Sequence, residues 1–446
     1  MSLLSKNLIL IHLESLNRIS FEHNINHLPN LKTLLSSSKY YENYFSSATS
    51  TYMVITDLFY GNSNIFEQLS NIKDMFSVEI NYKDIFTELQ EHGYITQVNG
   101  VDIMRNGEKY AKIYAPSAKS AMVPKVSDDF YGGIEKYIAN NDKFALFLLN
   151  LESHLEGYEN IPLKTTGDYC EVYQNRFQHL DSYVGRIIDI LKVTDKYKNT
   201  CIVLYGDHGD DFWGHGLHDG YTHAIEALPF LINCPLIVWN ADQSGECVDD
   251  LVSTVDLANL VKKWIGLDYQ DKEKRKYIFS RNLFAGQPTK SDSLNKSYMV
   301  SDGRYALLAS SAGLKMYCNT IDPLNSRNLL DFFYLKNGKL IYNSLFDTMK
   351  SSHYRSVLNQ NEIAEIIERF ASLKKILKEK ISSLYKANKL DIDFYSIDYD
   401  FTIKDQKLID KLKMRLPGAC TRSFFKSLLG DSGTEVVRNV LRKLGF

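Results

Sequence analysis

The chain has 446 residues, of which 44% are hydrophobic and 24% charged, and its 52 Lys and Arg against 54 Asp and Glu give a formal net charge of -2. A chain of this length can bury a large core and divide into a main domain and one or two smaller units. The balanced charge excludes electrostatic binding of nucleic acid as the main activity. No window approaches the roughly 20 apolar residues of a membrane span, so we expect no span and leave peripheral membrane association open.

The first apolar run begins within seven residues of the N-terminus, which leaves no room for a signal peptide. The six cysteines show no CxxC spacing. We therefore expect free thiols in a reducing compartment and a cytoplasmic protein, with an excised soluble domain as the alternative.

Several apolar runs of strand length follow one another along the chain. They cover residues 8–13, 144–151, 200–205 and 230–239, and intervening segments such as 183–191 carry helical periodicity. Because these runs are continuously apolar rather than alternating, they predict a sheet that is covered on both faces. The pattern favours an α/β fold with helices flanking a central, mostly parallel sheet.

Polar residues with metal-binding chemistry stand at the ends of two of these runs. Glu14 follows the first run, and Asp207 and His208 follow the third, where ligands gather in open parallel sheets. Two carboxylates and an imidazole suit one divalent cation, Zn²⁺ or Mn²⁺. Thr51 ends the hydroxyl-rich segment 46–51, and a hydroxyl held by the same ion becomes a nucleophile at neutral pH. The alternatives are a helix-capping carboxylate, an N-cap threonine and a solvated Asp-His turn.

The same residues carry a resemblance to the sulfatase-like branch of the alkaline phosphatase superfamily. The similar segments are 7–15, 51–61, 203–210, 226–232, 252–266 and 316–329, in the family's order. Glu14 followed by Ser15 resembles the form found in lipoteichoic-acid synthases and phosphoethanolamine transferases, which use a threonine nucleophile. Thr51 stands ten residues before Gly61, as the nucleophile does in sulfatases, and Ser50 is the next alternative.

The resemblance covers residues from about 7 to about 335 and implies a fold and a division of the chain. It implies an alkaline-phosphatase-like central sheet, a small C-terminal antiparallel sheet subdomain and a helical tail. We expect a catalytic domain over 1–268, an antiparallel subdomain over 269–350 and a mainly helical extension over 351–446. A long helix is predicted over 362–387 by its apolar spacing.

The resemblance also implies roles for the site residues. The implied metal ligands are Glu14, Thr51, Asp207 and His208. Thr51 would be the nucleophile, and the implied substrate-binding residues are His154, His215, His218 and Arg105, with His154 and His218 also able to act as general acid or base. A surface role for His154 is the alternative. A second metal is left open, and its candidate ligands are Glu152, His154, His215, His218 and His223.

The residues after Thr51 decide between reaction types within this family. Sulfatases make formylglycine from Cys or Ser followed closely by Pro and Arg, whereas Thr51 is followed by Tyr52, Met53 and Val54. We therefore interpret the chain as a metal-dependent phosphotransferase or phosphodiesterase that moves a phosphoethanolamine- or phosphoglycerol-like group, with a cell-surface glycan as one acceptor. The alternatives are a phosphate or phosphonate monoester hydrolase, a sulfatase, and a catalytically silent binding module that docks through its C-terminal helical region.

Overall fold

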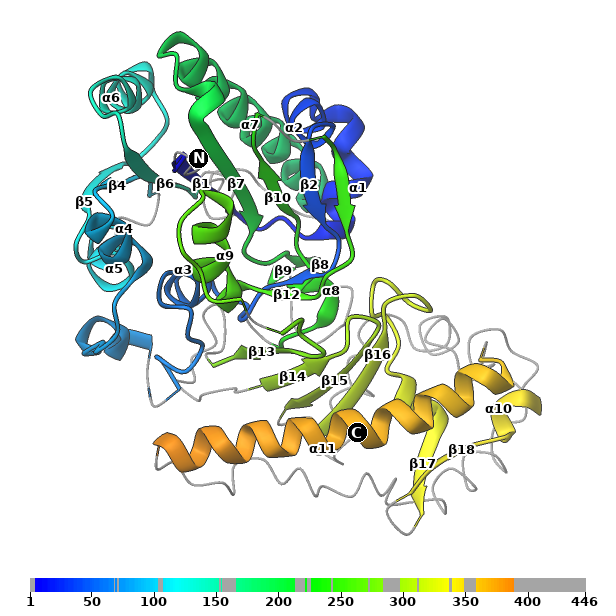
Figure 1. Cartoon of the computed structure of the whole chain (residues 1–446). Coiled ribbons are helices and arrows are strands. Elements are labelled where there is room, and N and C mark those ends of the chain that lie inside the picture. Colours follow the sequence, from blue (N-terminus) through cyan, green and yellow to red (C-terminus); the bar gives the residue numbers. More distant parts are fainter. Residues whose placement is uncertain are drawn as a thin grey trace. The chain divides into compact units, whose positions relative to one another are not determined.

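Figure 1 shows the computed structural model of the chain. The residues that the structure describes are 5–67, 69, 72–102, 107–151, 154, 166–212, 221–222, 226–241, 244–271, 273–283, 297–310, 313–336, 339–348 and 358–388. The chain divides into two compact units, Met1–Arg327 with Leu373–Tyr395, and Asn328–Ser372 with Ser396–Phe446. This division does not test the domain boundaries expected at 268 and 350, which stay predictions.

An eight-stranded sheet forms the centre of the first unit, in the order β11-β2-β10-β7-β1-β6-β4-β5. Its strands are β1 (Asn7–Leu13), β2 (Ser38–Tyr41), β4 (Ile95–Val101), β5 (Lys119–Val123), β6 (Phe144–Asn150), β7 (Thr200–Gly206), β10 (Leu236–Trp239) and β11 (Glu246–Val248). Only the pairings made by β10, with β7 and β2, are antiparallel in this sheet. The predicted α/β fold with a mostly parallel central sheet is confirmed.

Helices cover both faces of this sheet (Figure 1). One face packs against α1 (Arg18–Asn24), α2 (Pro29–Leu35), α6 (Asp128–Ala139) and α7 (Thr166–Val193). The other carries α3 (Thr51–Tyr60), α4 (Ile85–Glu91) and α5 (Gly107–Tyr114), with α9 (Leu257–Trp264) against α3. On that face the Phe59 ring packs against the rings of Phe86, Tyr114 and the strand residue Phe147. Burial from both sides explains why every residue of β1, β6 and β7 is buried.

The single strand predicted over 230–239 is wrong. The structure divides this run into a short helix, α8 (Pro229–Ile232), and the strand β10. Pro229 supplies the fixed φ of a first helical position, and Pro235 stands immediately before the strand, where a missing N–H costs no ladder bond. The two prolines therefore mark the starts of α8 and β10, which hydrophobicity alone does not separate.

A four-stranded antiparallel sheet completes the first unit. Its strands are β13 (Ile278–Asn282), β14 (Ser297–Ser301), β15 (Tyr305–Ser310) and β16 (Gly313–Cys318). Met299, Ala306 and Leu308 of this sheet share one apolar cluster with Phe45 and the α8 residue Phe230. The short pairs β3 (Tyr44–Phe45) with β12 (Val252–Ser253), and β8 (Asp211–Phe212) with β9 (Tyr221–Thr222), lie in the same unit.

The second unit contains β17 (Phe333–Lys336), its antiparallel partner β18 (Lys339–Tyr342) and α10 (Leu345–Thr348). The helix predicted over 362–387 is confirmed as α11 (Gln360–Asn388), of which the residues up to Ser372 belong to this unit. None of the described helices has the length and apolarity needed to cross a membrane.

Candidate metal and active site

The sheet register brings Glu14 and Asp207 together. β1 and β7 run parallel with Leu13 opposite Gly206, so the next residues of the two strands, Glu14 and Asp207, emerge side by side at the carboxyl edge. Ser15 then adopts a left-handed conformation with φ 58°, and its N–H donates to Asp207 Oδ1 at 3.0 Å. Its hydroxyl donates to Glu14 Oε1 at 3.1 Å. The turn after β1 thus holds both carboxylates in place.

Two glycines allow β7 to approach the turn after β1 this closely. A Cβ at Gly206 would overlap the backbone oxygen of Leu16, and a Cβ at Gly209 would overlap the side chain of Asn17. Asn17 is itself fixed, because its Oδ1 accepts a hydrogen bond from Ser20 N at 2.8 Å and so caps α1. These glycines therefore allow close packing of the backbone around the carboxylates.

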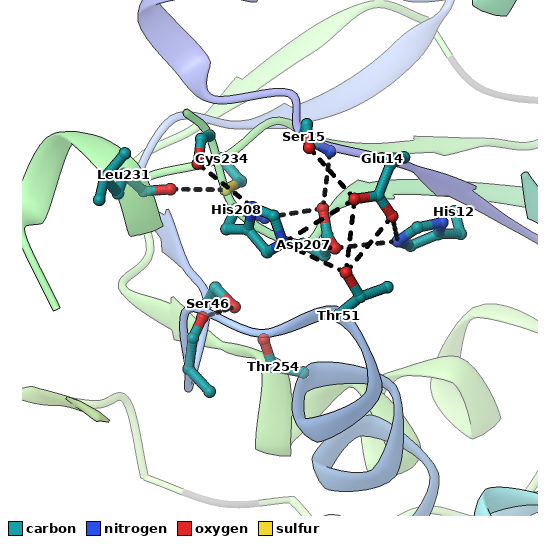
Figure 2. Close-up of polar contacts among 12 residues, drawn as sticks. His12, Glu14, Ser15, Ser46, Thr51, Asp207, His208, Leu231, Cys234 and Thr254 are labelled. Atoms are coloured by element: carbon teal, nitrogen blue, oxygen red, sulfur yellow. Dashed lines mark hydrogen bonds and ion pairs between the residues drawn. The ribbon is translucent and has the colours of Figure 1, made fainter. Parts of the chain in front are cut away.

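Helix α3 presents Thr51 to the carboxylates from the opposite side (Figure 2). Thr51 Oγ1 lies 3.4 Å from each Glu14 oxygen and 3.2 Å from His208 Nε2. Ser50 is the N-cap of α3 and makes no side-chain cap bond, and Thr51 is the first helical residue. The Thr51 hydroxyl points toward the carboxylates of the site (Figure 2). The positive end of the helix dipole favours negative charge at that position.

His208 points its Nε2 toward the same place. Its Nδ1 lies 3.2 Å from the carbonyl oxygen of Gly209, which favours a proton on Nδ1 and leaves Nε2 free to coordinate. Asp207 Oδ1 accepts hydrogen bonds from Ser15 N and, at 2.8 Å, from His208 N. Asp207 Oδ2 accepts none from the described residues, although it is buried and lies 3.2 Å from His208 Nε2.

Sequence reasoning missed His12, which lies in the same cluster. His12 Nε2 is 3.2 Å from Asp207 Oδ2 and 3.4 Å from Glu14 Oε2, and both residues of each pair are fully buried. One donor atom each from His12, Glu14 and Asp207 lie within 4.8 Å of one another, a grouping that could hold a metal ion. The signal in the sequence is the spacing His12-x-Glu14, which puts both side chains on one face of a strand.

Burial of two adjacent carboxylates creates an electrostatic need for a cation. Burial, followed by the charges of Asp207 and Asp210, raises the pKa of Glu14 well above its usual value. Burial would also raise the pKa of Asp207, but the imidazoles of His208 and His12 outweigh it and hold that pKa well below its usual range. A divalent cation between the two carboxylates would stabilise both in their charged form.

The donor set fits such an ion. The contacts among the side chains of His12, Glu14, Thr51, Asp207 and His208 run from 3.2 to 3.9 Å. In a tetrahedral arrangement of four of these donors, bonds of about 2.0–2.2 Å to nitrogen and oxygen place ligand atoms about 3.3–3.6 Å apart, and a fifth donor would make the ion five-coordinate. Hydroxyl, carboxylate and imidazole donors are those that Zn²⁺ and Mn²⁺ accept.

The other predicted site residues are not brought into this cluster by the described structure. His154 is buried after β6; its N donates to Leu151 O at 3.0 Å and its carbonyl oxygen accepts from Arg176, so its role in substrate binding stays a prediction. Arg105, His215 and His218 lie outside the described residues, as do the second-metal candidates Glu152 and His223. Their roles also stay predictions.

Comparison with known proteins agrees with the fold. A model of the sulfatase family matches residues 6–267, more than half of the chain, and the protein therefore belongs to the sulfatase family. No curated protein matches the chain in sequence.

Solved structures of two kinds of enzyme share the fold. The structure of a 2-O GAG sulfatase is 15% identical with a TM-score of 0.65, over 87% of this chain and 95% of that one. A protein solved with its substrate D-glucosamine-2-N,6-O-disulfate is 12% identical with a TM-score of 0.58, over 86% and 99%. The phosphonate monoester hydrolase of Agrobacterium radiobacter is 12% identical with a TM-score of 0.54, over 76% and 99%.

Proposed function

We propose that the protein is a metal-dependent hydrolase of phosphoric or phosphonic esters that uses Thr51 as its nucleophile. The observation that carries the proposal is the position of the Thr51 hydroxyl, within 3.4 Å of both Glu14 oxygens and 3.2 Å of His208 Nε2 at the start of α3. A buried hydroxyl beside the Glu14 carboxylate and the His208 imidazole is arranged for activation rather than for capping the helix.

The chemistry follows from the groups around Thr51. Its oxygen attacks phosphorus, the bond from Oγ1 to phosphorus forms, and the bond from phosphorus to the leaving alcohol breaks. Glu14 faces the hydroxyl and can accept its proton, which then passes to the departing alkoxide so that it leaves as the alcohol. Zn²⁺ or Mn²⁺ in the site would lower the pKa of the hydroxyl and neutralise charge on the phosphoryl oxygens. Water then attacks the phosphorus of the phosphothreonine and releases Thr51, completing hydrolysis.

Phosphorus rather than sulfur is favoured by the identity of the nucleophile. Threonine cannot give the formylglycine aldehyde, and Tyr52, Met53 and Val54 replace the residues that direct that modification in sulfatases. Structural neighbours that include a phosphonate monoester hydrolase support a fold able to host the reaction.

Transfer to an acceptor other than water is the second candidate. The turn Glu14-Ser15 favours it, because that pair resembles the lipoteichoic-acid synthases and phosphoethanolamine transferases. The first steps are then the same, and the phosphoryl group, carrying a glycerol- or ethanolamine-like substituent, passes from Thr51 to a glycan hydroxyl.

A substrate panel with matched variants tests the proposal. Chromogenic phosphate, phosphonate and sulfate esters are compared with wild type, Thr51→Ala, Thr51→Ser and the control Thr56→Ala on the same helix. We expect at least tenfold faster turnover of phosphorus esters than of sulfate, loss of turnover in Thr51→Ala and partial activity in Thr51→Ser. Thr56→Ala should keep its activity, because the Thr56 hydroxyl donates to Tyr52 O within the helix.

Mass analysis of the peptide that contains Thr51 separates the remaining possibilities. A phosphoryl adduct on Thr51 supports the nucleophile, and decay of the adduct only when glycan is added supports transfer over hydrolysis. Full turnover in Thr51→Ala would place the nucleophile elsewhere, with Ser50 the first position to examine. Faster turnover of sulfate esters would overturn the phosphoryl assignment, and no turnover of any ester would favour a binding module.

A further inference from the structure

We propose that His12 is a ligand of the metal ion at this site, so that the centre has two imidazoles and two carboxylates and prefers Zn²⁺ to Mn²⁺. The ligand set implied by family resemblance is Glu14, Thr51, Asp207 and His208, and it does not include His12. The inference rests on the metal centre of the proposed function and is independent of its substrate.

The first observation is a buried imidazole that faces two carboxylates, with Nε2 3.2 Å from Asp207 Oδ2 and 3.4 Å from Glu14 Oε2. The His12 side chain is 0% exposed, and neither ring nitrogen makes a hydrogen bond with the residues that the structure describes. Buried polar groups almost always have a hydrogen-bond partner, because a buried group without one loses its bonds to water and gains none in the protein. A ligand bond from Nε2 to a cation removes this cost for that nitrogen.

The second observation is the direction of the ring. His12 Nε2 and His208 Nε2 lie at the same distance, 3.2 Å, from Asp207 Oδ2. The two imidazoles approach that oxygen from opposite sides, with Glu14 and Thr51 completing the cluster (Figure 2). An ion that contacts His208 and Asp207 Oδ2 therefore lies within reach of His12 as well.

The third observation is the rigidity of the backbone that carries His12. His12 is paired with Tyr205 in the register between β1 and β7, in the fully buried centre of the sheet. The Tyr205 ring packs edge-on against the imidazole at 5.8 Å between centroids. A ligand on a central strand is held more exactly than one on a loop.

Two rival roles have to be separated from coordination. His12 could be an imidazolium that balances the charges of Glu14 and Asp207, or a hydrogen-bond donor that orients Asp207. Both rivals leave the metal with one imidazole from the described cluster, that of His208. Coordination gives two, and a second nitrogen donor strengthens binding of Zn²⁺ more than binding of Mn²⁺, which favours oxygen ligands.

The test counts imidazole ligands by X-ray absorption of full-length protein loaded with one equivalent of Zn²⁺, and measures Zn²⁺ and Mn²⁺ affinities by chelator competition. The variants are His12→Ala, His12→Gln and the control His27→Ala, whose side chain is exposed. Gln keeps a donor near the Nε2 position and so rescues a hydrogen-bonding role, but its neutral amide is a poor ligand for Zn²⁺. Circular dichroism of each metal-free variant establishes that it is folded.

We expect two imidazoles in wild type and one in both His12 variants. Zn²⁺ affinity should fall by about 100-fold or more in both, beyond the range typical of outer-shell residues, with a smaller loss for Mn²⁺. A single imidazole in wild type, or wild-type affinity in His12→Gln, would overturn the inference. Thr51→Ala separates the two proposals, since it should lose turnover and keep two imidazoles; turnover that survives this change overturns the proposed function alone.

Discussion

Replacing Asp57 by Ala removes the main partner of a buried arginine behind the nucleophile. Asp57 lies on α3, and Arg281 of β13 contacts it through Nη1 at 2.6 Å and Nη2 at 3.1 Å. Both side chains are 0% exposed. Ser47 Oγ donates to the same carboxylate at 2.5 Å, and Arg281 N donates to Ser47 O at 3.0 Å. The pair thus fastens β13 to the loop and helix that carry Thr51.

The Asp57→Ala change leaves the buried Arg281 guanidinium without its two contacts to Asp57. Removing one partner of a buried ion pair typically costs about 3–5 kcal/mol, because the other charge is left without compensation. Glu67 Oε1 remains 2.8 Å from Arg281 Nε, so compensation is lost only in part. We therefore expect a loss near the lower end, about 3 kcal/mol, in the free energy of unfolding. Turnover should fall as well, because the segment before Thr51 loses its anchor.

Urea unfolding followed by circular dichroism measures the cost. With a slope of about 3 kcal/mol per molar urea, a loss of 3 kcal/mol lowers the midpoint by about 1 M. The control is Lys83→Ala, which breaks the exposed pair with Glu91 and should leave the midpoint unchanged. An equally small effect of Asp57→Ala would refute the reasoning that the buried pair holds α3 in place.

Three further outcomes are expected. Chelation should lower the melting temperature of wild type and leave that of Asp207→Ala unchanged, because only a protein with an intact site gains stability from the ion; equal shifts in calorimetry would contradict this. Asp181→Ala should cost about 1–2 kcal/mol, since Asp181 accepts hydrogen bonds from the backbone N–H groups of Asn30 and Leu31 at the start of α2; an unchanged urea midpoint would count against that capping role. Ser15→Gly should weaken metal binding with little change in stability, as isothermal titration and thermal melts of the metal-free protein will show.

The centre of the sheet could be predicted because β1, β6 and β7 are buried on both faces and so carry continuous apolar runs. Those runs also located the strand ends, and with them Glu14, Asp207 and His208. The antiparallel direction of β10 could not be predicted. Strand pairing depends on side-chain packing between distant segments, and the composition of a strand does not indicate whether it pairs parallel or antiparallel.

The position of His12 in the candidate metal site could not be predicted from the local sequence pattern. A single histidine inside an apolar strand is ordinarily part of the core, and its role is visible only once the register of β1 with β7 places Asp207 next to Glu14. The pair of Asp57 and Arg281 is hidden for the same reason, since its members are 224 residues apart. Contacts of this kind depend on the assembled fold.

Ser15 connects backbone strain with the metal site, because it has a left-handed conformation and its hydroxyl donates to Glu14. A left-handed residue with a Cβ costs about 1–2 kcal/mol, which Gly avoids, while Gly adds about 0.5–1 kcal/mol of backbone entropy to the unfolded chain. Loss of the hydroxyl bond to Glu14 costs about 1 kcal/mol, so these terms nearly cancel.

Metal affinity has no such cancellation, because the Ser15 hydroxyl orients a carboxylate ligand and the loss of such a partner typically weakens binding about 10–100-fold. Ser15→Ala is the matched variant, since it loses the same hydroxyl and keeps the strain, and it should weaken metal binding equally while also lowering stability by about 1 kcal/mol. Wild-type metal affinity in both variants would show that Glu14 is oriented without Ser15, and the strained conformation would then serve only to aim the Ser15 N–H at Asp207.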